Sequence, residues 1–286
     1  MIRSIRLHPI ISVLTYAATG VTALAPVARS QPALPPKAKA DSAKTPAALF
    51  TTKDYLIGGA FVVGTFAMFP FDQRLAKHLT NPGAQANKFF KNASTGVEWI
   101  ASPGAYVIGG SLYAVGRIGH FERVADLGWH GTEAVFVADA VTYALKGLAG
   151  RARPFFAGDT LPNDFKFAKG FRDGNRQSFP SGHATSAFAA AAAVTAETGT
   201  WWPKSTWVIG PLMYGGATMV GLSRMYHNKH WASDVVLGAA IGTFSGQKIV
   251  QYSHAHPTRL DKVMLHVSAL PDGNGGWALA WSGTLP

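Results

Sequence analysis

The stretch Pro180-Ser-Gly-His-Ala-Thr-Ser-Ala-Phe-Ala-Ala-Ala-Ala-Ala-Val-Thr-Ala-Glu197 limits the kind of fold that this chain can adopt. Alanine is the strongest helix former, so we expect a helix from His183 to Glu197. Ser181 is a favourable N-cap residue, and Gly182 lets a ligand approach the backbone closely. Free N–H groups and the positive end of a helix bind anions. The stretch therefore predicts a helix, and an anion site at its start where His183 would face the anion. Taken alone, it is also typical of a plain helix cap.

Uncharged or amphipathic segments of helix length lie on both sides of this stretch. We expect further helices over Tyr55–Phe71, Trp99–Gly116, Glu122–Leu148, Ser205–Ser223 and Trp231–Tyr252. No alternating strand pattern interrupts them, so the sequence predicts an all-α bundle of about six helices over residues 54–252. The uncharged runs 55–71, 99–116 and 205–223 reach the length of a membrane span. A membrane-embedded bundle and a peripheral or soluble one both stay open.

The two ends of the chain differ from this bundle. Arg3 and Arg6 precede an uncharged stretch that ends in small residues, which is typical of a signal peptide over residues 1–30. An uncleaved anchor helix is the alternative. Residues 31–53 are rich in Pro, Ala and Lys and predict a linker. In the tail, 253–286, two alternating apolar segments flank a turn rich in Gly and predict a short β-hairpin, either a flap on the bundle or a membrane-interface anchor.

Composition limits the chemistry and the partners. The 286 residues contain no cysteine, which excludes disulfides, zinc–thiolate sites and cysteine nucleophiles. The net charge of +11 favours anionic partners, such as a phospholipid surface or a phosphorylated substrate. No basic run or nucleic-acid-binding module accompanies the charge, so we expect no nucleic-acid partner. The sequence indicates no oligomeric state.

A basic segment precedes the quoted stretch. Lys146 and Arg153 are seven residues apart and would share one face of a helix, while Pro154 disfavours helix at Arg153. At a helix end, the Arg153 guanidinium could bind two phosphate oxygens, and the lysine adds a point charge. We expect Arg151 to face solvent. Taken alone, this segment is also typical of an ordinary solvated helix end.

A third cluster follows the quoted stretch. Arg224 comes directly after the run 205–223, and His230 and Asp234 are four residues apart, which places both on one helix face. A carboxylate beside one ring nitrogen of a histidine fixes its tautomer and makes the other nitrogen a better nucleophile. A surface ion pair is the alternative. No further Asp, Glu or His spacing nearby completes a metal site.

In this order, the three clusters resemble the signature of the type 2 phosphatidic acid phosphatase family. That family also includes bacterial acid phosphatases and vanadium haloperoxidases. The matching positions are Lys146, Arg153-Pro154, Pro180-Ser181-Gly182-His183, Ser223-Arg224, His230 and Asp234. The resemblance covers about residues 54–252 and implies a helical phosphatase.

The resemblance also implies a role for each residue. His230 would be the nucleophile that forms a phosphohistidine, and Asp234 would orient it. His183 would protonate the leaving group and then activate water. The phosphate-binding residues would be Lys146, Arg153, Ser181, Gly182 and Arg224. Three cations would replace a metal, so no metal or other cofactor is expected; vanadate would be a cofactor only for a haloperoxidase.

The predicted substrate is a phosphorylated lipid. We expect an exported enzyme that hydrolyses a phosphomonoester or pyrophosphate, in association with the membrane, in the periplasm or at the outer face of the inner membrane. A broad-specificity periplasmic acid phosphatase for soluble phosphomonoesters is the nearest alternative. A vanadate-dependent haloperoxidase and a non-catalytic phospholipid-binding envelope protein are two others.

The segment between the first two clusters carries basic residues among six phenylalanines. This pattern fits an amphiphilic substrate at a membrane surface, or a loop whose rings pack on the bundle. His227 is expected to line the pocket. The other histidines have no sequence neighbours that would make a site and are expected at the surface, among them His78, His120, His254 and His256.

Overall fold

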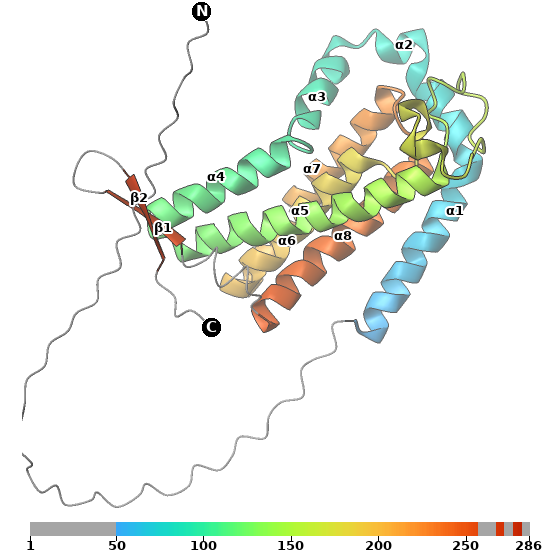
Figure 1. Cartoon of the computed structure of the whole chain (residues 1–286). Coiled ribbons are helices and arrows are strands. Elements are labelled where there is room, and N and C mark those ends of the chain that lie inside the picture. Colours follow the sequence, from blue (N-terminus) through green and yellow to red (C-terminus); the bar gives the residue numbers. More distant parts are fainter. Residues whose placement is uncertain (1–49, 257–266, 272–276, 282–286) are drawn as a thin grey trace, which may run out of the picture. The chain divides into compact units, whose positions relative to one another are not determined.

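The computed structural model describes residues 50–256, 267–271 and 277–281, and helices dominate it (Figure 1). The α-helices of the described part are α1 Thr52–Thr80, α2 Pro82–Gln85, α3 Lys88–Glu98, α4 Gly104–Ile118, α5 Glu122–Ala149, α6 Gly182–Trp201, α7 Thr206–Tyr226 and α8 Ala232–Ala255. Short 3-10 turns are η1 Lys169–Phe171, η2 Gly174–Arg176 and η3 Pro203–Ser205. The predicted all-α fold is confirmed. The predicted signal peptide 1–30 and most of the predicted linker lie outside the described residues.

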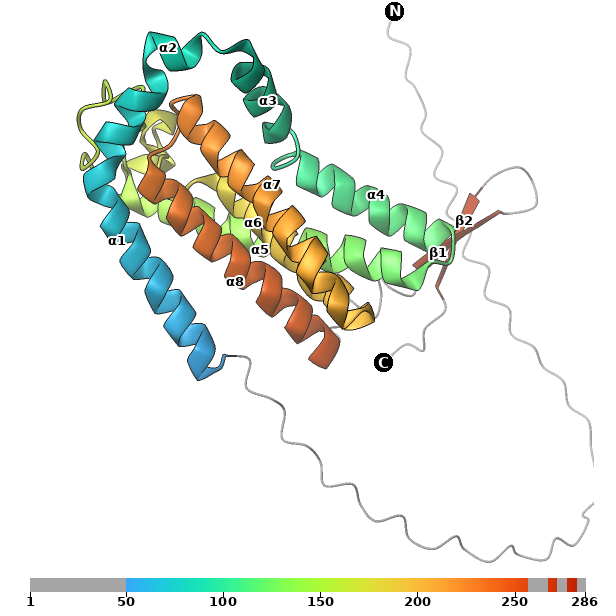
Figure 2. The same cartoon turned by 180° about the vertical axis from the view of Figure 1, so that it is seen from behind.

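Helix α6, the Ala-rich helix of the quoted stretch, packs against α5, α7 and α8. Figures 1 and 2 show these four helices side by side. Small residues let α6 and α8 approach closely. A Cβ atom on Gly238 would lie 2.6 Å from the carbonyl oxygen of Ser181, and one on Gly242 would lie 2.3 Å from that of Thr185. The glycine spacing on α8 therefore sets the packing of the two helices that begin at the predicted phosphate site.

The connection between α5 and α6 folds over the end of the bundle at which α6 and α8 begin. Helix α5 ends at Gly150, whose φ of +58° is left-handed. A Cβ there would lie 1.8 Å from the carbonyl oxygen of Lys166, so the turn requires glycine. The Ser181 N–H donates to the carbonyl oxygen of Asp234 at 2.9 Å, which joins the start of α6 to the start of α8.

Some helix boundaries differ from the prediction. The uncharged run from Trp99 becomes helical only at Gly104, because residues 99–103 form a turn in which a Cβ on Gly104 would overlap the carbonyl oxygen of Trp99. Helix α3 was not predicted, because Lys88–Glu98 contains no long apolar run. Helix α1 extends beyond the uncharged run 55–71 into a polar segment that ends at Thr80.

Two short strands lie in the tail. Strands β1 Val267–Pro271 and β2 Trp277–Trp281 pair antiparallel, with Val267 opposite Trp281 and Pro271 opposite Trp277. The connecting residues 272–276 lie outside the described residues. The predicted hairpin as a unit, and its role as a flap or an anchor, stay predictions.

The described part exposes many large apolar side chains. Helix α1 alone among the described helices is long and apolar enough to cross a membrane, judged by length and composition. Val63 and Phe66 on this helix are each 68% exposed. Helix α4, which contains most of the run 99–116, has only 15 residues. The described helices therefore offer an apolar outer surface and one candidate span, at α1.

Candidate active site

Four helix ends meet where the sequence predicts the phosphate site. Lys146 lies in the last turn of α5, His183 in the first turn of α6, Arg224 in the last turn of α7 and Asp234 in the first turn of α8. A Cβ on Gly182 would lie 3.5 Å from Cε of Lys146, which places the lysine beside the start of α6. The fold thus assembles residues that are up to 88 positions apart in the sequence.

The three predicted cations lie close enough to affect one another. Burial, followed by the charge of Arg153, lowers the pKa of Lys146 to about 7, and Arg224 contributes in the same direction. Lys146 Nζ donates to the carbonyl oxygen of Gln177 at 2.7 Å. Arg153 Nε donates to the carbonyl oxygen of Gly174 at 3.1 Å. Like charges held together in a partly buried site are stabilised by an anion placed among them.

His230 is almost fully buried, with 4% of its surface exposed. Its Nδ1 lies 2.8 Å from the carbonyl oxygen of Ser178. Because a carbonyl oxygen can only accept, Nδ1 carries the proton in this hydrogen bond, which leaves the lone pair on Nε2. Burial and the nearby charges of Lys146 and Arg153 lower the pKa of His230 to about 3, although Asp234 opposes them. The imidazole is therefore neutral at pH 7, as a nucleophile must be.

Asp234 contacts His230 less directly than predicted. Its Oδ2 lies 3.7 Å from His230 Nδ1, whereas the Ser178 carbonyl accepts the Nδ1 hydrogen bond. The carboxylate instead accepts hydrogen bonds from the Ser178 hydroxyl at 2.5 Å and from the Trp231 N–H at 2.7 Å. It thus holds the segment whose carbonyl orients His230. Burial would raise the pKa of Asp234, but Arg151, His230 and the Ser178 hydroxyl lower it to about 2.

The prediction that Arg151 faces solvent is wrong. Its side chain is fully buried and forms ion pairs with Asp72 at 2.7 Å and with Asp234 at 2.5 Å. The turn at Gly150 redirects the chain after α5, so the spacing from Lys146 does not place Arg151 on the outer helix face. Four aromatic rings surround the guanidinium at 4.6 to 5.7 Å, namely Phe69, Phe165, Phe179 and Trp231. Arg151 therefore holds Asp234, and through it the His230–Asp234 pair, in place.

Glu98, at the end of α3, is a site residue that the sequence did not reveal. Its carboxylate pairs with Arg224 Nη1 at 2.6 Å and with His227 Nδ1 at 2.7 Å. His227 Nε2 in turn lies 3.1 Å from the hydroxyl of Ser94. Burial would raise the pKa of Glu98, but the bonds to His227 and Arg224 lower it. Glu98 therefore stays ionised and fixes Arg224, while His227 joins α7 to α3.

The start of α6 carries His183 and Ser181. Burial and the charge of Arg224 lower the pKa of His183 to about 4. Ser181 is fully buried, and its Oγ accepts from the Ala184 N–H at 3.5 Å as the N-cap. The predicted cap is therefore present. The phosphate-binding roles of Ser181 and Gly182 stay predictions.

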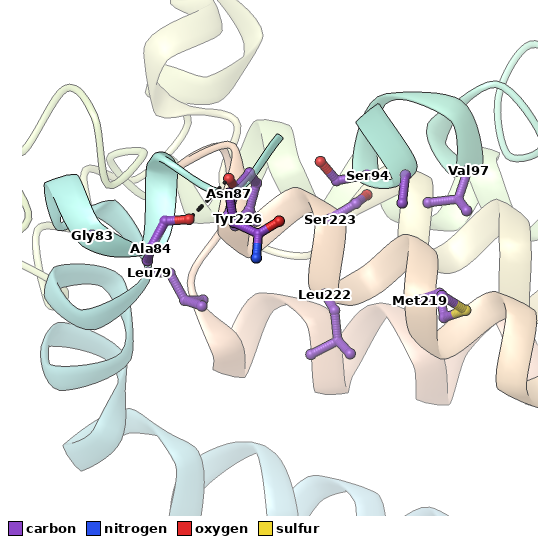
Figure 3. A pocket seen from close by; sticks show the side chains of 11 residues that line it. Leu79, Gly83, Ala84, Asn87, Ser94, Val97, Met219, Leu222, Ser223 and Tyr226 are labelled. Atoms are coloured by element: carbon purple, nitrogen blue, oxygen red, sulfur yellow. Dashed lines mark hydrogen bonds between the residues drawn. The ribbon is translucent and has the colours of Figure 1, made fainter. Parts of the chain in front are cut away.

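An apolar cavity of about 420 Å³ lies next to this site (Figure 3). Its lining includes Leu79 of α1, Val97 of α3, and Met219 and Leu222 of α7. Ser223, the neighbour of Arg224, also lines it. The cavity thus adjoins the segment that supplies one of the phosphate-site cations. Its volume lies within the range that is usual for ligand pockets.

Some phenylalanines of the α5–α6 connection pack on the protein, and at least one is exposed to solvent, so both predicted behaviours occur. Phe165 and Phe179 pack around Arg151, and Phe171 lies against Gly147 and the ring of Tyr143. In contrast, Phe167 is 81% exposed. Phe165 and Phe171 pack on the loop with one side and remain 40% and 48% exposed, whereas Phe167 is free to contact an external apolar surface.

Comparison with known proteins finds a family match that begins later in the chain than the predicted range of about 54–252. Residues 128–257 match the family model described as the PAP2 superfamily. The matched segment contains all eight predicted site residues, whereas Asp72 and Glu98 lie outside it. The predicted resemblance to the type 2 phosphatidic acid phosphatase family is confirmed.

A curated relative is the Lipid A 1-phosphatase of Porphyromonas gingivalis. It is 37% identical over 116 residues, which are 40% of this chain and 22% of the relative, so the chain spans about a fifth of the relative's length. A solved structure, the first transmembrane PAP2 type phosphatidylglycerolphosphate phosphatase from Bacillus subtilis, covers 68% of this chain and 98% of its own, with 19% identity and a TM-score of 0.29. That structural likeness is too weak to carry an argument.

Proposed function

We propose, from the match of residues 128–257 to the PAP2 superfamily model, that this protein is a metal-independent phosphatase that hydrolyses a phosphomonoester or pyrophosphate of a lipid. The observation that carries the proposal is the buried, neutral His230 beside three cations. A nucleophile with a free Nε2 lone pair and a positively charged site around it suit attack on a phosphate group. The three fixed cations can neutralise the charge that a bound metal neutralises in other phosphatases.

The reaction we propose has two steps. In the first, Nε2 of His230 attacks phosphorus, the bond to the leaving oxygen breaks, and His183 donates a proton to that oxygen. In the second, neutral His183 takes a proton from water, the water oxygen attacks phosphorus, and the bond to His230 breaks. The free His183 has a pKa of about 4, and a bound phosphate anion between it and Arg224 favours its protonated form. The substrate therefore helps to create the acid that the first step needs.

Two features support a lipid rather than a small soluble substrate. The apolar cavity beside Ser223 can accept part of an acyl chain while the phosphate lies near Arg224. The outward apolar side chains of α1 can hold the protein at a membrane, where such a substrate resides. The name of the curated relative, a lipid A phosphatase, is consistent with this class. We propose that the enzyme acts after export, at the outer face of the inner membrane or in the periplasm.

The test is the variant His230→Ala, assayed for phosphate release from detergent-dispersed lipid phosphates and from a soluble aryl phosphate. We expect a loss of about 10³-fold or more with helical circular dichroism unchanged. The matched control is His78→Ala, an exposed histidine on α1, which should retain full activity.

One outcome would overturn the proposed mechanism, and three others would favour the rival functions. Full activity in His230→Ala would overturn the mechanism. Faster turnover of the aryl phosphate than of every lipid phosphate would favour the broad-specificity acid phosphatase. Bromide oxidation on addition of vanadate would favour the haloperoxidase, and lipid binding without hydrolysis would favour a non-catalytic protein.

A further inference from the structure

A second group of ligand-type side chains lies at the other end of the bundle. His130 is near the start of α5, Glu197 near the end of α6 and His254 near the end of α8. At about 1.5 Å per residue, Glu197 lies roughly 22 Å along α6 from Gly182, and His254 roughly 30 Å along α8 from Asp234. This group is therefore separate from the phosphate site. The sequence predicted no site around His254, and this group corrects that prediction.

The three side chains converge on one point. Glu197 is fully buried and His130 is 3% exposed, while 40% of the His254 side chain faces solvent. His254 Nε2 lies 2.9 and 3.0 Å from the two Glu197 oxygens, and His130 Nδ1 lies 3.4 Å from Oε2. One atom from each residue lies within 4.8 Å of the other two.

These separations approach those of a tetrahedral metal centre. With metal–ligand distances of about 2.0–2.2 Å, neighbouring ligand atoms in such a centre lie about 3.3–3.6 Å apart. The 3.4 Å between His130 Nδ1 and Glu197 is within this range, and the contacts of His254 are only slightly shorter. Small rotations of the partly exposed His254 ring would open the space for an ion.

The charges at this point also favour a cation. A buried carboxylate needs a positive partner, and His254, whose pKa is raised by Glu197, supplies one only while it is protonated. Asp126, one helical turn before His130, adds a second carboxylate, whose charge interacts with all three residues. A divalent ion would balance the two negative charges.

We propose that His130, Glu197 and His254 bind one divalent transition-metal ion, with Zn²⁺ as the best match. Two imidazoles and a carboxylate suit Zn²⁺, whereas Ca²⁺ and Mg²⁺ prefer all-oxygen sites. Asp126 or a water molecule completes the coordination. The ion joins α5, α6 and α8 at the end far from the phosphate site. It holds the bundle together and takes no part in phosphate hydrolysis.

The test measures zinc on the metal-stripped full chain, purified in detergent without a histidine tag. We expect one Zn²⁺ per chain by calorimetry and by elemental analysis, a rise in melting temperature on adding Zn²⁺, and tetrahedral absorption bands with Co²⁺. The variants His254→Ala and Glu197→Gln should lose all three signals. The control His256→Ala, two residues from His254 and stacked on Tyr252, should keep them.

Two results would overturn the proposal. The first is a wild-type chain that takes up no stoichiometric Zn²⁺, in which case the group is a hydrogen-bonded ion pair. The second is zinc binding that persists unchanged in His254→Ala. Because His254 is partly exposed, this variant tests the site even if Glu197→Gln does not fold. Phosphatase activity measured below the melting temperature should be the same with and without Zn²⁺, which keeps this test independent of the proposed function.

Discussion

Lys146 is the cation of the proposed phosphate site whose charge changes near neutral pH. Burial, with the charges of Arg153 and Arg224, lowers its pKa to about 7. The lysine is therefore charged below pH 7 and increasingly neutral above it in the free enzyme. A bound anion favours the charged form, so anion binding takes up a proton once the pH exceeds this value.

This behaviour predicts a pH dependence of anion inhibition. The inhibition constant for sulfate, whose own charge is constant across this range, should be flat below pH 7 and rise by up to about tenfold per pH unit above it. In Lys146→Arg the rise should disappear, because arginine stays protonated. The measurement is competitive inhibition of aryl phosphate hydrolysis from pH 5.5 to 9. An equal rise in the arginine variant would assign the titration to another group.

At the scale of helices, local sequence was a good guide where each helix carries its own signal. Alanine content and the cap at Ser181 located α6, and uncharged runs located the middle of α1 and α7. The predicted motif residues meet because they lie at the ends of these helices. Neither the resemblance nor the helix pattern required knowledge of distant contacts.

Other features could not be predicted because their signal exists only in three dimensions. Glu98 lies 129 residues before its partner His227, and His130 lies 67 residues before Glu197. Arg151 is separated by 79 residues from Asp72. An isolated acidic or basic residue in a sequence is most often solvated. The sequence therefore does not reveal that these side chains are buried and paired, because their partners are brought near only by the fold.

Helix α7 carries Arg224 of the proposed phosphate site and also lines part of the apolar cavity. A substitution on this helix can therefore test acyl-chain binding separately from phosphate binding. Leu222→Trp should fill the cavity and lower kcat/KM for a long-chain lipid phosphate by about tenfold or more, while hydrolysis of an aryl phosphate changes little. The matched control is Leu212→Trp, on the same helix, exposed and outside the cavity lining. Equal losses for both substrates in Leu222→Trp would show that the cavity does not hold the lipid.

At the scale of the molecule, the apolar outer face of α1 predicts membrane attachment. Each large apolar side chain that moves from water into lipid contributes about 1.5–3 kcal/mol. The double variant Val63→Glu with Phe66→Glu should therefore weaken binding to neutral phosphatidylcholine vesicles by about a hundredfold or more, measured by flotation. Aryl phosphate hydrolysis should persist, since both side chains point away from the bundle.

The control for this experiment is Lys53→Glu, an exposed substitution at the start of α1 with the same change in net charge. It should float with the vesicles like the wild type. Unchanged flotation of the double variant would place the membrane contact on another part of the chain.

Arg151 makes the reacting pair dependent on parts of the chain that are synthesised far apart. Its two carboxylate partners come from α1 and α8, and removing one partner of such a buried ion pair costs about 3–5 kcal/mol. During synthesis, Asp72 and Arg151 are made well before Asp234 and His230. His230, the proposed nucleophile, therefore acquires its support only when α8 has docked. A nascent chain that lacks α8 therefore has no assembled His230–Asp234 pair.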